Sequence, residues 1–176
     1  MCNISDLDSL EHLCYTSIRH SKSKIRNLQS TINMSRITRV DGTPTQQRNA
    51  IRRAIAEILR RLMDKKTIDD ETKDMLAFIV VGLRSMDQSI DQSATAWEKR
   101  DYYIKADQFR REWLWLPDTA RRLEEILRSN DWSTAPIELA GLSARFSDIK
   151  VTTYTRPPTL WQGTYRKLLA SPNGKR

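Results

Sequence analysis

The sequence predicts an all-α protein, a helical bundle of about four to six helices with a less regular C-terminal segment. Apolar residues recur at spacings of three and four through most of residues 1–132, as they do on one face of a helix. Five glycines and six prolines in 176 residues are too few for a turn-rich β fold. We therefore expect a bundle over residues 1–132 and an extension over residues 133–176 that packs on the bundle or on a partner.

A first helix is predicted over residues 5–34, followed by a basic loop over residues 35–42. Its seam alternates steps of four and three, which is the pattern of a helix packed against neighbours. The seam consists of Cys14, Ile18, Ser21, Ile25, Leu28 and Ile32. Lys22, Lys24 and Arg26 give the same helix a basic stretch.

The second helix has clear start signals. Thr43 is a suitable N-cap, Pro44 suits the first turn, and Gln46 completes a capping box. An apolar stripe at helical spacing follows, formed by Ile51, Ala54, Ile55, Ile58, Leu59, Leu62 and Met63. This stripe is expected to face the core.

Arginines occupy the other side of this second helix. At about 100° per residue, Arg53 and Arg60 lie opposite the apolar stripe. Arg52 and Arg61 flank it on either side. With a rise of 1.5 Å per residue the four side chains span about 12 Å, enough to meet several phosphates of one strand.

A third helix is predicted to begin in the acidic stretch TIDDETKDM (67–75) and to occupy the centre of the bundle. The continuous apolar run MLAFIVVGL (75–83) indicates that it is covered on several sides. We interpret its acids as capping residues that oppose the helix dipole, and not as a metal centre. These acids are Asp69, Asp70, Glu71 and Asp74.

The stretch TAWEKRDYYIKADQFRREWLW (95–115) interleaves aromatic and basic residues. Three of its six aromatic residues follow a helical seam, so we expect one helix with these three rings in the core and Arg100 and Arg111 outside. Tyr103 and Trp115 lie off the seam and are predicted to form a partner interface. Pro117 is expected to end this helix.

The rest of the chain is less regular. A short amphipathic helix is expected around Leu123, Ile126 and Leu127, and another over residues 137–146. Residues 149–155 are β-prone, and residues 160–169 are either a closing helix or a docking segment.

Catalytic signatures are missing from the sequence. It has no glycine-rich phosphate loop, no HExxH and no CxxC, and only two histidines, so we expect no enzyme activity and no cofactor. All cysteines and histidines lie in the first twenty residues, at Cys2, His12, Cys14 and His20. Their spacing does not suit zinc ligation, and Cys14 is interpreted as a small core residue, so no metal site is predicted.

The net charge of +8 is unevenly distributed, with the basic excess in residues 1–66 and 133–176. Such clustering indicates a polyanionic partner, most often nucleic acid, although solubility alone is the alternative explanation. The predicted nucleic-acid-binding residues are Arg48, Arg52, Arg53, Arg60, Arg61, Lys22, Lys24, Arg26, Arg100 and Arg111. With two cysteines, no signal peptide and no apolar run of membrane-spanning length, we expect a cytoplasmic protein without membrane contact.

From DDETKDMLAFIVV through SATAWEKRDYYIKADQFRREWLW, the sequence resembles the small-subunit family of CRISPR Cascade-type effector complexes. It is most similar to the helical region that closes the large subunit in the type I-D variety. The resemblance covers roughly residues 45–130 and implies a helical bundle without catalysis. It also implies assembly with backbone and large subunits and with other copies of itself. Guide RNA and target DNA, including the displaced strand, are the implied ligands, held without sequence recognition by the protein.

Other function classes remain open at this point. A helical protein–protein adaptor with a basic face for an acidic partner explains the same composition. A helix-turn-helix regulator is disfavoured because no short glycine-containing turn joins the second helix to a neighbour. Salt-sensitive, sequence-blind binding of nucleic acid separates the first interpretation from these two.

Overall fold

The computed structural model describes residues 42–171. In chain order this range contains α2 (Pro44–Asp64), α3 (Asp70–Glu98), α4 (Tyr103–Glu112), α5 (Trp115–Ser129), α6 (Ala135–Arg145), the 3-10 helix η4 (Pro158–Leu160) and α7 (Thr164–Ala170). No strand occurs within it, so the all-α prediction is confirmed for this range. The helix predicted over residues 5–34, with Lys22, Lys24 and Arg26, lies outside the described residues, as do Cys2, His12, Cys14 and His20.

Helix α2 begins as the sequence predicts. The Thr43 N–H donates to Gln46 Oε1 at 2.9 Å, and the Gln46 N–H donates to Thr43 Oγ1 at 3.4 Å, which is a complete capping box. The predicted stripe is buried from Ile51 to Leu62, but Met63 at its end is exposed. The apolar face of α2 therefore ends one residue earlier than expected.

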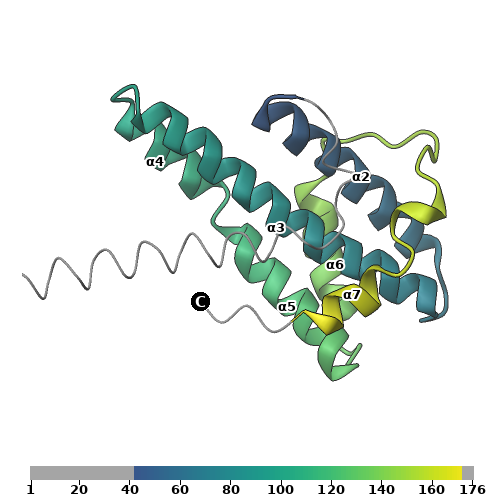
Figure 1. Cartoon of the computed structure of the whole chain (residues 1–176). Coiled ribbons are helices and arrows are strands. Elements are labelled where there is room, and N and C mark those ends of the chain that lie inside the picture. The colour runs from purple at the N-terminus through teal and green to yellow at the C-terminus, as the bar shows by residue number, and fades with distance from the viewer. Residues whose placement is uncertain (1–41, 172–176) are drawn as a thin grey trace, which may run out of the picture. The chain divides into compact units, whose positions relative to one another are not determined.

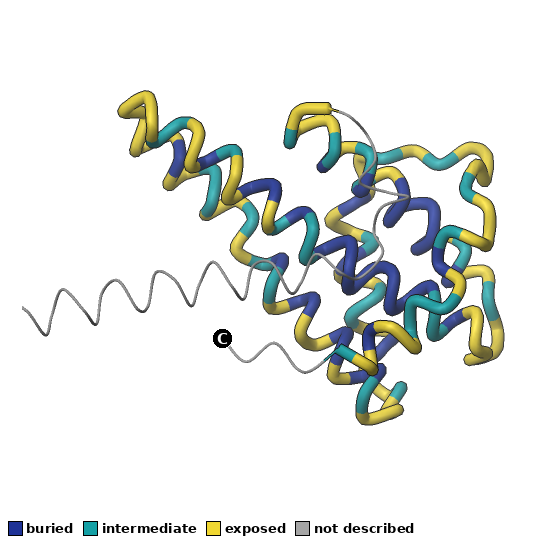
Figure 2. The backbone as a smooth tube through the Cα atoms, viewed as in Figure 1, coloured by how far each residue is buried: buried dark blue, intermediate teal, exposed yellow. Residues whose placement is uncertain are grey.

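Helix α3 runs through the middle of the described part of the chain, between α2 and α5 (Figure 1). It contacts α2, α4, α5 and α7, and residues 75–83 are buried throughout (Figure 2). The Asp69 carboxylate caps its first turn by accepting the Thr72 N–H at 2.7 Å. A helical segment that is buried on every side, as residues 75–83 are, needs no polar face, which explains the unbroken apolar run.

Gly82 allows α2 and α3 to approach closely. A Cβ at this position would lie 3.1 Å from Ile55 Cδ1 and 3.4 Å from Ile51 Cγ2. We predict that Gly82→Leu lowers the free energy of unfolding by about 1–3 kcal/mol, because the added atoms force the two helices apart. Urea denaturation measures the effect. Gly82→Ala is the control and should stay within about 1 kcal/mol of the wild type, since the helix propensity of alanine offsets the crowding. Equal stability of the leucine variant and the wild type would contradict this packing.

The expectation of one helix over residues 95–115 is wrong. Helix α3 ends at Glu98, a tight turn containing Asp101 in the left-handed region (φ 62°) follows, and α4 returns along α3. The α3–α4 hairpin is held by the Trp97 and Phe109 rings, whose centroids lie 4.9 Å apart. Pro117 lies in the first turn of α5, where its missing N–H removes no helical hydrogen bond, so it does not end a helix.

The C-terminal part packs on the bundle. Residues 147–157, here called the strap, lie along α2, with an ion pair from Asp148 to Arg52 and hydrogen bonds from Thr155 and Arg156 to Glu57. The β-prone segment forms no strand within the described range. Beyond the strap, Trp161 is almost completely buried. All described residues belong to one compact unit, with no break at residue 132.

Candidate nucleic-acid interface

Arg48, one of the predicted phosphate contacts, does not lie on the surface, so little of its side chain is open to a phosphate. Its side chain is buried between α2 and the α3–α4 hairpin, where the guanidinium donates to Ser89, Ser93 and Thr45 hydroxyls and lies over the Phe109 ring. Burial lowers the pKa of Arg48, and neighbouring Arg52 lowers it further. Arg48 lies three residues before Ile51, which places it on the apolar face of α2. This spacing is the sequence signal that could have predicted the burial of Arg48.

Arg52 and Arg61 are occupied by the strap. Arg52 pairs with Asp148 at 2.6 Å. Arg61 donates to the Arg156 carbonyl at 3.1 Å and lies 4.3 Å from the Tyr154 ring centroid. These two arginines therefore hold the strap against α2 and are only partly open to a ligand.

Glu57 is the buried carboxylate between α2 and the strap. It accepts the Arg156 N–H at 2.7 Å, the Thr155 hydroxyl at 2.9 Å and the Arg61 guanidinium at 3.3 Å. Burial by itself would raise the pKa of Glu57, but these hydrogen bonds outweigh it and hold the pKa below its usual value. Glu57 is thus ionised at neutral pH, and its hydrogen bonds go to Arg61 and to the strap.

Arg53 and Arg60 remain on the surface, as predicted, one above the other on the outer side of α2. Within residues 42–171 neither has a carboxylate partner, and Arg60 interacts with the Tyr154 hydroxyl. Lys150 is exposed in the strap between its two anchoring points on α2, and Arg145 is exposed at the end of α6, three residues before Asp148. We call Arg53, Arg60, Arg145 and Lys150 the strap face.

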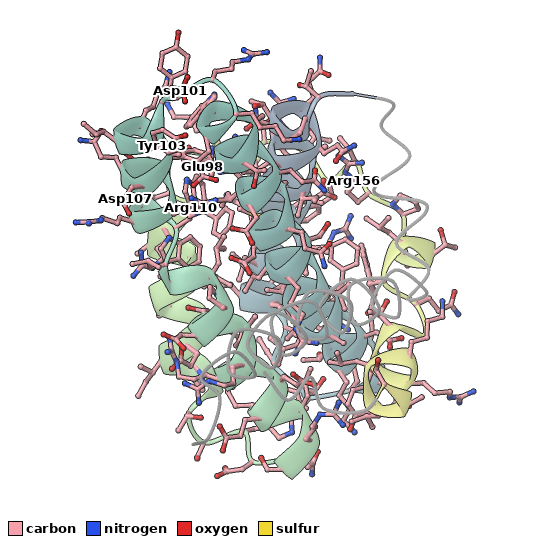
Figure 3. All side chains as sticks on the ribbon, turned by 60° about the vertical axis from the view of Figure 1, so that its left-hand side comes forward. Glu98, Asp101, Tyr103, Asp107, Arg110 and Arg156 are labelled. Carbon is pink, nitrogen blue, oxygen red and sulfur yellow. The ribbon has the colours of Figure 1, made fainter. Side chains whose placement is uncertain are left out.

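The α3–α4 hairpin carries the other predicted residues. Arg100 is exposed at its turn, while Arg111 pairs with Asp107 at 2.8 Å along α4. Figure 3 shows Glu98 and Arg110 between the two helices, where they form an ion pair, and Tyr103 near the turn with Asp101. The hydrogen bond between Arg110 and Glu98 lowers the pKa of Glu98 and raises the pKa of Arg110.

The hairpin turn also exposes a small apolar patch. Tyr102, Tyr103 and Ile104 are 58%, 61% and 78% exposed, respectively. The Tyr103 hydroxyl donates to Asp101 at 3.1 Å, and its ring stays open to solvent. This placement is compatible with the predicted partner interface at Tyr103.

Trp115, the second predicted interface residue, lies instead in a half-buried aromatic cluster. Its ring stacks near Trp113, with centroids 6.1 Å apart. Arg145 covers the Trp115 ring at 4.6 Å, and Arg52 lies 5.9 Å from the Trp113 centroid. Sequence reasoning missed Arg145 as a member of this cluster, because its proximity to Trp115 depends on how α6 packs against α5.

The acidic start of α3 has structural partners. Asp69 caps the helix and binds Lys65 at 2.7 Å, and these bonds lower the pKa of Asp69 and raise that of Lys65. Asp74 accepts the backbone N–H groups of Gly163 and Tyr165 at 2.8 and 2.9 Å, which fixes the start of α7. Among residues 42–171, no group of three or more metal-ligating side chains is arranged to hold an ion.

Comparison with known proteins gives no relative on which to build. No protein-family model, no curated protein and no solved structure matches the chain. The resemblance to the CRISPR small-subunit family therefore stays a prediction. None of the described helices is both long enough and apolar enough to cross a membrane.

Proposed function

We propose that this protein is a non-catalytic subunit that binds the sugar–phosphate backbone of nucleic acid through the strap face. One observation carries the proposal: four exposed cations on α2, α6 and the strap have no carboxylate partner within the described residues. Arg53 and Arg60 are seven residues apart, so their helix positions are separated by about 10 Å along one side of α2. Fixed cations at such spacing attract phosphates without reading bases.

The finer assignment rests on the resemblance in residues 45–130. We propose that the protein acts in the cytoplasm as a small subunit of an RNA-guided DNA-targeting complex of the CRISPR Cascade type. In that setting it assembles with backbone and large subunits and further copies of itself. It stabilises the guide RNA–target DNA duplex and the displaced strand, while base pairing supplies sequence recognition.

The strap face is tested by replacing Arg53 and Arg60 together by alanine. We expect the double variant to bind labelled single-stranded DNA about tenfold more weakly at low salt, equally for two unrelated sequences. The slope of log K against log salt should fall by about 0.7 for each phosphate that the variant no longer neutralises. Fluorescence anisotropy measures both quantities.

The matched control for this experiment removes the same charge elsewhere. Arg166 and Lys167 on α7 are exposed cations outside the strap face without a carboxylate partner among residues 42–171, and their double alanine variant should bind like the wild type. If both double variants lose the same affinity, net charge alone explains binding and the strap face is not a site. If the wild type does not bind at low salt, the proposed function is wrong for the isolated chain.

The apolar patch at the hairpin turn favours a second candidate, a helical protein–protein adaptor. Exposed tyrosine and isoleucine side chains at the end of a helical hairpin suit contact with another protein. This candidate predicts that Tyr103→Ala and Ile104→Ala abolish co-purification of a protein partner and leave nucleic-acid affinity unchanged. Loss of nucleic-acid binding in these variants would count against the separation of the two surfaces.

A further inference from the structure

A hollow lies between α5 and α6, on the side of the molecule that includes Arg145 of the strap face. Its volume is about 350 Å³, and its walls include Trp115 and Arg122 from α5 and Glu138, Gly141 and Arg145 from α6. Pockets that bind small organic groups usually start at about 300 Å³. The hollow is therefore large enough for one planar ring with its substituents.

Arg145 provides a stacking surface at this hollow. Its guanidinium lies 4.6 Å from the Trp115 ring centroid, and Trp115 is backed in turn by Trp113 and by the edge of Phe146. The planar cation thus lies over an aromatic ring, with no carboxylate partner among residues 42–171. Unpaired nucleobases stack on arginine planes supported in this way.

Glu138 gives the hollow a hydrogen-bond acceptor. Its Oε1 accepts the Arg122 Nε–H at 2.7 Å, and Arg122 also donates to the Thr119 hydroxyl at 3.3 Å. Glu138 Oε2 accepts no hydrogen bond within the described residues. A carboxylate oxygen in this position recognises an exocyclic amino group, as acidic side chains do with N4 of cytosine.

Gly141 keeps this space open. It lies within α6, where glycine is less favourable than alanine because the unfolded chain loses more backbone freedom. A Cβ at this position would meet no atom of residues 42–171 within 4 Å. A larger side chain here is expected to fill the hollow without disturbing the packing of α6.

We propose that this hollow binds a single unpaired nucleobase that carries an exocyclic amino group. The ring stacks on the Arg145 guanidinium, and its amino group donates to Glu138. The inference rests on the proposed function in so far as the base belongs to a bound single strand. It adds a base contact to an interface otherwise made of phosphate contacts.

The first experiment uses mononucleotides, so it does not depend on strand binding by Arg53 and Arg60. Saturation-transfer NMR with dCMP should show binding to the wild type and weaker binding of dTMP, which lacks the amino group. Gly141→Leu should weaken dCMP binding at least about tenfold, the scale of one base-stacking interaction. Ala140→Leu adds the same side chain to the neighbouring exposed position of α6 and should leave dCMP binding unchanged.

A second variant distinguishes a blocked hollow from a misfolded protein. Glu138→Gln keeps the shape of the side chain but supplies an amide donor, and it should reduce the preference for dCMP over dTMP. Equal dCMP affinity in the wild type and Gly141→Leu, or no dCMP binding at millimolar concentration, would overturn the proposal.

Binding of single strands then tests the base site and the backbone interface separately. Gly141→Leu should weaken binding of an all-cytosine strand and leave that of an abasic strand of the same length unaffected, whereas replacing Arg53 and Arg60 weakens both. One outcome would refute the base site and leave the backbone interface intact. In that outcome the protein binds the abasic strand tightly, and Gly141→Leu binds the all-cytosine strand as well as the wild type does. Binding of dCMP without strand binding would refute the interface and leave the base site intact.

Discussion

Replacing Trp161 by alanine is expected to lower the free energy of unfolding by about 3–5 kcal/mol, the largest effect we predict for a single side chain. Trp161 follows η4 and is 1% exposed, and the Arg61 guanidinium lies 5.3 Å from its ring centroid. The substitution leaves a large void where the C-terminal part meets the bundle. Urea denaturation monitored by circular dichroism measures the loss.

Trp161→Phe is the informative companion of this variant. The indole Nε1 is buried and has no hydrogen-bond partner within the described residues, so its removal eliminates an unsatisfied donor. Phenylalanine should therefore cost clearly less than alanine, about 1 kcal/mol or below. A phenylalanine variant as unstable as the alanine variant would contradict this expectation.

Glu57→Ala is the second large effect, with an expected loss of about 3 kcal/mol. The substitution removes the carboxylate that accepts hydrogen bonds from Arg61, Thr155 and the Arg156 N–H. These partly buried donors then lose their acceptor. Asp148→Ala is the matched control, because it also removes an ion pair between strap and α2. The Asp148 side chain is 59% exposed, so its loss should cost no more than about 1 kcal/mol. Equal losses in the two variants would show that Glu57 is not the main attachment of the strap.

The same carboxylate gives a pH signature. Its pKa is held below the ordinary value of 4.5, so the folded state binds the proton less readily than the unfolded state. The stabilisation is fully present above pH 4.5 and is lost as the pH falls through the lower, folded-state pKa. The stability difference between wild type and Glu57→Gln should therefore shrink below pH 4.5. A constant difference down to strongly acidic pH would contradict the ionised state of Glu57.

Local sequence signals predicted the two longest helices well. The capping box at Thr43 and the apolar stripe of α2 act within a few residues, and both are found where expected. The same holds for the central position of α3, because an apolar run of nine residues cannot be satisfied at a surface. These features depend on periodicity and capping, which a sequence displays directly.

The features that sequence reasoning missed depend on contacts between distant segments. The turn after Glu98 contains neither glycine nor proline, and a seam of three and four resumes at Tyr102, five residues after Trp97, because α4 faces α3 on the return path. Arg48 is buried because Ser89 and Ser93, more than forty positions away, supply hydroxyl partners. Likewise, a helical wheel of α2 shows Arg52 and Arg61 as surface cations. It cannot show the strap that covers them, because the strap belongs to a distant part of the sequence.

The position of α3 affects how the protein folds while it is being made. Its contact with α7 joins segments roughly 80 residues apart, so one apolar side of α3 leaves the ribosome well before its cover exists. At about 5–20 residues per second, that side stays uncovered for roughly 4–16 s of synthesis. Exposed surface of this kind attracts other nascent chains and molecular chaperones. We therefore expect the yield of native protein to depend more on chaperone supply during translation than its modest size suggests.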